Sequence, residues 1–161
     1  MKNLLQTLCG LFLVVFYSSC MNSGDNRVDV LIVGGGASGV TSGIQAARMG
    51  ANTLILEETT WLGGMLTSAG VSAVDGNYRL PAGLWGEFKN RLSDYYGGLD
   101  SLKTGWVSNV LFEPSVGNRI FHEMVSAEKN LKVWKQTRLE EVKRVGDEWI
   151  AKVNVEGQGT K

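Results

Sequence analysis

A glycine-rich turn is the part of this sequence with the clearest chemistry. The apolar run Val30–Val33 leads directly into Gly34, Gly36 and Gly39, which have Gly-x-Gly-x-x-Gly spacing. In this spacing the first glycine permits a tight turn, the second lets the backbone approach a pyrophosphate, and the third lets a helix pack close to the strand. The helix expected from Ala37 to about Met49 would point its positive N-terminus at that phosphate. The pattern predicts a nucleotide-phosphate site.

An acidic residue follows at the distance that such a site requires. Gly50 fits the position just after the helix, and Thr53–Leu56 is typical of a second buried strand. Glu57 closes that strand, 23 positions after Gly34, where its carboxylate could accept hydrogen bonds from both ribose hydroxyls of an adenosine. The alternative is a strand–helix joint whose glycines serve packing alone. The flanking elements favour a dinucleotide of the NAD or FAD type.

A later glycine pair favours FAD over NAD as the cofactor. From Val28 to Val71 the chain resembles the N-terminal region of FAD-dependent oxidoreductases with the glutathione-reductase-like fold, whose extended pattern includes Gly43 and Glu57. In these families a Gly-Gly pair after the acidic residue passes close to the flavin nucleotide, and Gly63-Gly64 matches it. The resemblance implies FAD as cofactor and hydride transfer between the flavin and a small substrate. The expected cofactor-binding residues are Gly34, Gly35, Gly36, Ala37, Ser38, Gly39, Glu57, Gly63 and Gly64.

The rest of the chain resembles, more loosely, the branch of this family related to heterodisulfide reductase, whose members can carry iron–sulfur clusters held by cysteines. Both cysteines of this chain, Cys9 and Cys20, lie within its first 20 residues. We therefore expect neither a cluster nor another metal site. The single histidine, His122, is expected to pack or to be solvated, and Asp75-Gly76 is expected to be a turn. No residue is assigned a catalytic role.

The N-terminus predicts export. Lys2 precedes an apolar stretch from Leu4 to Tyr17, and Ser18-Ser19-Cys20 follows. This layout is typical of a secretory signal peptide over residues 1–19, and it resembles a bacterial lipoprotein signal in which Cys20 becomes lipidated. An ordinary cleaved signal and an uncleaved anchor are the alternatives. Residues 20–26 would form a polar tether, and the protein would lie in the bacterial envelope, attached to a membrane through lipid.

The composition narrows the possible partners. Lysine and arginine number 16, as do aspartate and glutamate, so the formal net charge is 0. Since the chain has no basic excess, there is no electrostatic case for nucleic-acid binding. Hydrophobic residues make up 43% of the chain, which is ample for a packed core.

The remaining elements follow from hydrophobic periodicity and from turn residues. One helix is expected between Pro81 and Gly97, and another from Pro114 to about Asn130. A third parallel strand is expected over residues 131–135, and two strands around a Gly146-Asp147 turn. Core-facing positions are expected at Leu84, Trp85, Phe88, Leu92, Tyr95, Ile120, Met124 and Val125, and solvated positions at Glu87 and Glu123.

These elements predict an α/β, Rossmann-like FAD/NAD(P)-binding domain with a parallel sheet and a β-meander. In the resembling fold we expect the third strand to lie beside the first. Residues 27–161 would form the N-terminal part of that domain, incomplete at its C-terminus and inactive by itself, because a later strand and a substrate domain are expected beyond Lys161. The alternatives are an NAD-dependent reductase and a non-catalytic lipoprotein that keeps the nucleotide-binding fold.

Overall fold

The computed structural model describes residues 26–76, 78–157 and 159–160. The predicted signal peptide, Cys20 and most of the tether lie outside the described residues. The described elements, in chain order, are β1 (Val30–Val33), α2 (Ala37–Arg48), β2 (Thr53–Leu56), the short 3₁₀ helix η2 (Gly64–Leu66), α3 (Gly83–Tyr96), the 3₁₀ helix η3 (Leu99–Leu102), α4 (Pro114–Ser126), β3 (Leu131–Trp134), β4 (Thr137–Val145), β5 (Glu148–Val155) and β6 (Gly159–Thr160).

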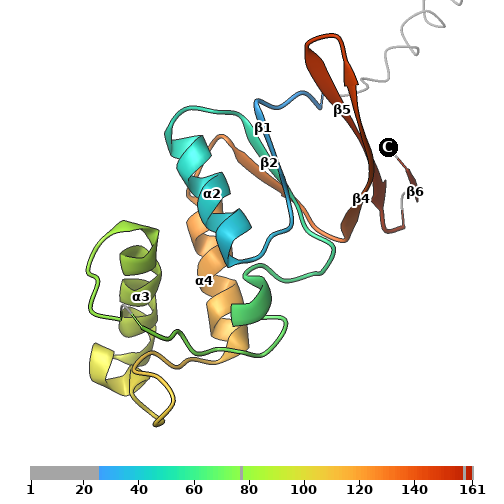
Figure 1. Ribbon diagram of the computed structural model, residues 1–161. Coiled ribbons are helices and arrows are strands. Elements are labelled where there is room, and N and C mark those ends of the chain that lie inside the picture. The colour runs from blue at the N-terminus through green and yellow to red at the C-terminus, as the bar shows by residue number, and fades with distance from the viewer. Residues whose placement is uncertain (1–25, 77, 158, 161) are drawn as a thin grey trace, which may run out of the picture.

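A three-stranded parallel sheet forms the middle layer, in the order β1-β2-β3 (Figure 1). Thr53 of β2 pairs with Val30 on one side and with Leu131 on the other. The prediction that the third strand lies beside the first is therefore wrong. All four residues of β2 are buried, whereas exposed and half-buried residues alternate along β1. A strand as apolar as β2 gains most from the central position, where it has a neighbour on each edge.

Helices α2 and α4 cover one face of this sheet, and α3 packs against them on the outside (Figure 1). The core between these layers includes Ile44, Ile55 and Met124, each fully buried. Phe88 of α3 stacks on Phe121 of α4, with ring centroids 4.5 Å apart. The predicted inward-facing residues of α4 are confirmed as buried.

One prediction about α3 is wrong, and a second, for Glu87, omits an ion pair. Tyr95 is 49% exposed, and the Arg119 guanidinium lies over its ring, 4.2 Å from the centroid. Glu87 is not simply solvated, because its carboxylate accepts two hydrogen bonds from Arg48, at 2.6 and 2.9 Å. Arg48 also donates to Glu128, at 2.7 Å, so one guanidinium at the end of α2 binds both α3 and the turn that follows α4. Helix α4 also ends earlier than predicted, at Ser126, and a turn leads into β3.

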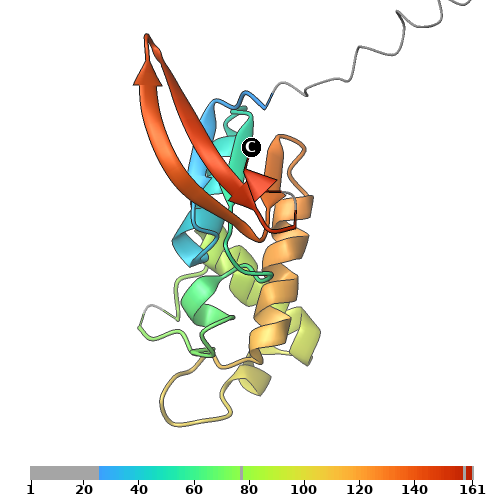
Figure 2. The ribbon, with the colours of Figure 1, turned by 90° about the vertical axis from the view of Figure 1, so that its right-hand side faces the viewer.

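The β4–β5 hairpin crosses the opposite face of the sheet, which confirms the predicted meander (Figure 2). Val153 of β5 packs with Leu54 and Leu56 of β2 and is 5% exposed. Further along the hairpin every residue from Glu140 to Ile150 is exposed. The hairpin is therefore anchored at its base and extends away from the sheet.

Candidate nucleotide-binding site

The glycine turn lies at the carboxyl end of β1 and has the predicted geometry. Gly34 has φ +98°, a conformation that side chains disfavour, and its N–H donates to the Leu56 carbonyl at 2.8 Å. A Cβ on Gly39 would collide with the Gly34 carbonyl oxygen. The first and third glycines are thus required by the turn and by the close packing of α2.

The second glycine is different, because nothing within the described residues requires it. Gly36 has φ −63°, which any residue adopts, and a Cβ there would meet no atom of the described residues within 4 Å. It is the N-cap of α2, and in the described structure neither a side-chain cap nor an acidic residue satisfies the first turn, which contains Ala37 and Ser38. Free N–H groups and open space in front of them form a cradle that fits a phosphate.

Glu57 is held in place at the carboxyl end of β2. Its carboxylate is 2.7 Å from the Gly35 N–H and 2.7 Å from the Thr59 N–H, both of which donate to it. The residue is only 8% exposed. A carboxylate has about four acceptor positions, so two remain for ribose hydroxyls. The backbone of Glu57 is also fixed, since its N–H donates to the Trp134 carbonyl and its carbonyl accepts from Thr137.

Gly35 has a role that the sequence did not indicate. A Cβ on this residue would lie 2.8 Å from the Leu62 side chain and 2.9 Å from the Glu57 carboxylate. Gly35 is buried, so its main contribution is to let Glu57 approach the turn. The sequence contains one sign of this role, a further glycine between Gly34 and Gly36. The Gly-x-Gly-x-x-Gly pattern does not specify the residue at that position.

The glycine pair packs directly on the turn. The Gly63 N–H donates to the Gly35 carbonyl at 2.8 Å, and Gly63 forms a β-bridge with Gly36. Both Gly63 (φ +106°) and Gly64 (φ +54°) adopt left-handed backbone, and a Cβ on Gly64 would be 3.0 Å from the Gly36 Cα. The two glycine motifs, far apart in the sequence, therefore build one continuous backbone surface.

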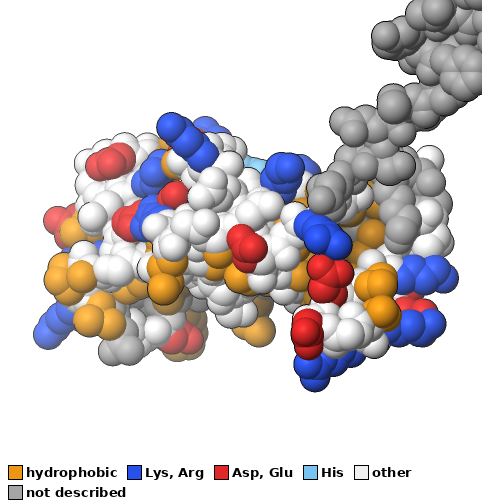
Figure 3. Space-filling view, turned by 90° about the horizontal axis from the view of Figure 1, so that it is seen from above, with side chains coloured by type: hydrophobic (Ala, Val, Ile, Leu, Met, Phe, Trp, Pro, Cys, Tyr) orange, Lys and Arg blue, Asp and Glu red, His pale blue; other side chains and the backbone are white. Residues whose placement is uncertain are grey.

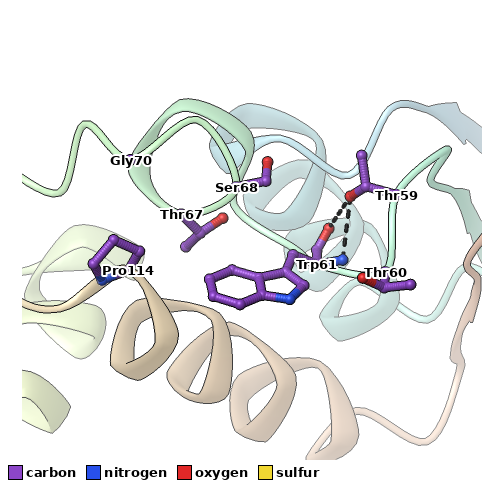
Figure 4. Close-up of a pocket in the computed structure, with 7 residues that line it drawn as sticks. All are labelled: Thr59, Thr60, Trp61, Thr67, Ser68, Gly70 and Pro114. Carbon is purple, nitrogen blue, oxygen red and sulfur yellow. Dashed lines mark hydrogen bonds between the residues drawn. The ribbon is translucent and has the colours of Figure 1, made fainter.

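A pocket of about 360 Å³ adjoins this surface (Figure 4). The Thr59 hydroxyl donates to the Trp61 carbonyl and accepts from its N–H, which orders the start of the pocket wall. Thr59 also donates its own N–H to Glu57, so the pocket begins beside the acid. Trp61 was not among the predicted site residues. The lining residues are Thr59, Thr60, Trp61, Thr67, Ser68, Gly70 and Pro114.

The other residues that the sequence analysis discussed as possible functional groups lie outside this site. His122 is half-buried on α4, where burial, with a smaller contribution from the Lys135 charge, lowers its pKa from the ordinary 6.5. Asp75 and Gly76 lie on an exposed bend, as predicted.

Among the residues that the structure describes, no cluster of three or more His, Cys, Asp or Glu side chains could hold a metal ion. The helices of this same part are too short or too polar to span a membrane.

Strand, glycine turn, helix, strand and acid, arranged in this way, define a dinucleotide-binding fold. The family model described as FAD dependent oxidoreductase matches residues 29–161, and the chain belongs to that family. FAD is therefore the cofactor that the family membership indicates. No curated protein sequence matches the chain significantly.

Solved structures of other proteins share the fold of this chain. The p-nitrophenol 4-monooxygenase PnpA from Pseudomonas putida superposes with a TM-score of 0.55 at 14% identity, over 82% of this chain and 37% of that one. The anhydrotetracycline hydroxylase OxyS from Streptomyces rimosus gives a TM-score of 0.56 at 13% identity, over 84% and 29%. The chain thus spans about a third of the length of these two structures.

Proposed function

We propose that this chain is the FAD-binding front portion of an exported flavin-dependent oxidoreductase that exchanges a hydride with a small-molecule substrate. The observation that carries this proposal is the open space at Gly36, a glycine that neither backbone conformation nor packing explains. Close approach of a pyrophosphate explains it. When bound, FAD supplies the hydride-transfer chemistry, while the protein supplies binding, orientation and electrostatics.

The chain's own groups suit the adenosine diphosphate half of the cofactor. The N–H groups of Ala37 and Ser38, at the N-terminus of α2, would donate to phosphate oxygens. The Glu57 carboxylate would accept from the ribose hydroxyls. Because Gly35 and Thr59 already hold that carboxylate, little ordering of the side chain remains to be done on binding.

A pair of glycine substitutions tests the cradle in the protein expressed from its whole reading frame. Gly36→Ala should leave the thermal midpoint unchanged but weaken FAD binding at least tenfold, because the new methyl group occupies the phosphate position. Gly105→Ala is the matched control, since a Cβ there makes only ordinary contacts with Leu111, at 3.6 and 3.8 Å. Equal FAD affinity in the Gly36→Ala variant would place the pyrophosphate elsewhere. A colourless protein that binds NAD and not FAD would contradict the flavin function itself.

We further propose that residues 27–161 are the N-terminal part of a larger FAD-binding domain. In the described structure β1 pairs on one edge only, with β2. Leu31 and Val33, on its hairpin side, are 36% and 56% exposed. Residues 20–161 alone should therefore bind FAD poorly, as followed by flavin fluorescence during titration. Tight stoichiometric binding by a monomer would contradict the proposed incompleteness.

Export and lipidation are proposed from the N-terminal sequence. The apolar stretch followed by Ser18-Ser19-Cys20 supports cleavage before Cys20 and acylation of its thiol. Mass spectrometry of the mature N-terminus should find a lipid-modified Cys20. An unmodified N-terminal residue other than Cys20 would show ordinary signal cleavage instead.

A further inference from the structure

Helix α4 holds the glycine pair in place from a distant part of the chain. The Leu62 N–H, directly before Gly63, donates to the side-chain oxygen of Asn118 at 2.9 Å. The Leu62 carbonyl accepts from the Thr67 hydroxyl at 2.6 Å, and Thr67 is 1% exposed. Figure 4 shows Trp61 and Thr67 of this segment lying over α4. Both backbone polar groups of Leu62 are therefore fixed by side chains.

Leu62 transmits this position to the phosphate cradle. Its side chain is fully buried, and a Cβ on Gly35 would be only 2.8 Å from it. The next residue, Gly63, donates its N–H to the Gly35 carbonyl at 2.8 Å and forms the β-bridge with Gly36. A shift of Leu62 would therefore move one wall of the cradle relative to the glycine turn.

Packing alone restrains this wall in one direction. A Cβ on Gly63 would be 2.7 Å from the Phe121 ring and 2.7 Å from the Thr67 methyl group, so the segment has little room to move toward α4. Apolar contacts are not directional, and they resist approach more than they resist sliding. The hydrogen bond from Leu62 to Asn118 is directional and joins the segment to the helix at one point.

The residue type at position 118 also favours this role. Asn118 lies in the second turn of α4 (Pro114–Ser126), beyond the position that caps the helix. Asparagine is a weaker helix former than alanine or leucine, because its side chain competes for backbone hydrogen bonds. Here the side chain is half-buried and accepts from the backbone of another segment. Contact with that segment explains an asparagine that helix formation does not.

We infer that Asn118 is a positioning residue for FAD, which holds the wall formed by Leu62, Gly63 and Gly64 at the width that the cofactor requires. When the acceptor is lost, the wall must be ordered as FAD binds, and this cost reduces the affinity. Asn118 would thus act through the Leu62 backbone. The inference rests on the proposed flavin function and deepens it, because it adds a residue of α4 to a site otherwise built from residues 34–64.

Substitutions at position 118 test the acceptor in the protein expressed from its whole reading frame. Asn118→Leu keeps the size but removes the acceptor, and should weaken FAD binding about fivefold, the scale for losing one hydrogen bond. Asn118→Ala should give the same loss. Asn118→Asp keeps an acceptor oxygen, close to a helix N-terminus that favours negative charge, and should bind FAD within about twofold of wild type. At saturating FAD the visible absorption band of the flavin should shift in Asn118→Leu and not in Asn118→Asp, since the glycine pair is expected beside the flavin nucleotide.

Asn52→Leu is the matched control. The Asn52 side chain donates to the Arg27 carbonyl at 3.1 Å, directly before β2. It therefore lies at the amino ends of the strands, the opposite end of the sheet from the glycine turn. Figure 3 views that end of the molecule, where basic, acidic and apolar side chains are interspersed. The same substitution there should leave FAD affinity and the flavin spectrum unchanged, and thermal denaturation checks that each variant is folded.

Each other outcome overturns the inference. Equal FAD affinities for wild type and Asn118→Leu would show that Leu62 needs no acceptor from α4, and an unchanged flavin spectrum would limit Asn118 to stabilising the fold. Equal losses in Asn118→Leu and Asn118→Asp would assign the effect to another property of the side chain. An equal loss in Asn52→Leu would indicate general destabilisation. A wild-type protein that binds no FAD would overturn the flavin function as well.

Discussion

The glycine turn and the β4–β5 hairpin are two regions of the same sheet domain, held together in different ways. At the turn, Gly35, Gly39 and Gly64 lie so close to neighbouring segments that one added carbon would clash or press on them. On the hairpin, eight residue pairs are aligned between the two strands, yet the outer half buries nothing against the sheet. The site depends on contacts between segments distant in sequence, whereas the hairpin depends on pairing within itself. Adding or removing a small side-chain group should therefore change the free energy of unfolding strongly at the turn and little on the outer hairpin.

The largest effect is expected from Gly39→Ala. Its new Cβ would collide with the Gly34 carbonyl oxygen, so α2 must move away from β1. Overpacking of this kind should lower the free energy of unfolding by about 3 kcal/mol. Urea denaturation of the Gly39→Ala and Gly105→Ala variants measures it. Equal midpoints for the two would show that the turn is less constrained than its contacts indicate.

Glu57→Ala should have the next largest effect. It leaves the Gly35 and Thr59 N–H groups without their acceptor and removes the proposed ribose contact. We expect a loss of about 1–3 kcal/mol in the free energy of unfolding, and a similar loss in FAD binding. Glu58→Ala is the control, because that side chain is 68% exposed and makes a long ion pair, at 3.9 Å, with Arg138. If Glu58→Ala weakens FAD binding more than Glu57→Ala, the ribose contact belongs to Glu58.

Replacing Arg48, which binds Glu87 and Glu128, should have a smaller effect on stability, and this effect should depend on pH. Hydrogen bonds from Arg48 hold the pKa of Glu87 below its ordinary value of 4.5. Because this pKa is lower in the folded state, the contribution to stability is present above pH 4.5 and is lost as the pH falls through the folded value. Arg48→Ala should cost about 1 kcal/mol at pH 7, since the pair is partly exposed. Denaturation at pH 7 and pH 3 should show the difference from wild type narrowing in acid. A constant difference would assign the effect of Arg48 to packing.

The smallest effect is expected on the outer hairpin. Ile150 is 55% exposed, so Ile150→Thr should change the free energy of unfolding by less than about 0.5 kcal/mol. Val153→Ala on the same strand should cost distinctly more, because Val153 is 5% exposed and packs on β2. Thermal denaturation of both variants compares them. A large loss for Ile150→Thr would show that the outer hairpin is covered in the whole protein.

Much of the local structure could be predicted from the sequence. The strand Thr53–Leu56 agrees with the prediction, and α2 ends within one residue of it, because apolar periodicity and a glycine at the helix end are local signals. The hairpin turn lies at Gly146 and Asp147, as predicted, and Gly146 has φ +63°. Glu57 was placed correctly at the end of its strand, since motif spacing fixes which end of the strand it occupies.

Only the tertiary structure determined how these elements combine. The strand order, the exposure of Tyr95 and the ion pairs of Glu87 depend on which surfaces meet, and periodicity within one element carries no information about its neighbour. The same holds for Gly35, whose lack of a side chain matters because Leu62 and Glu57 approach it from elsewhere in the chain. Spacing along the sequence therefore located the glycine turn and its acidic residue. Close packing between distant segments decided what each of them contacts.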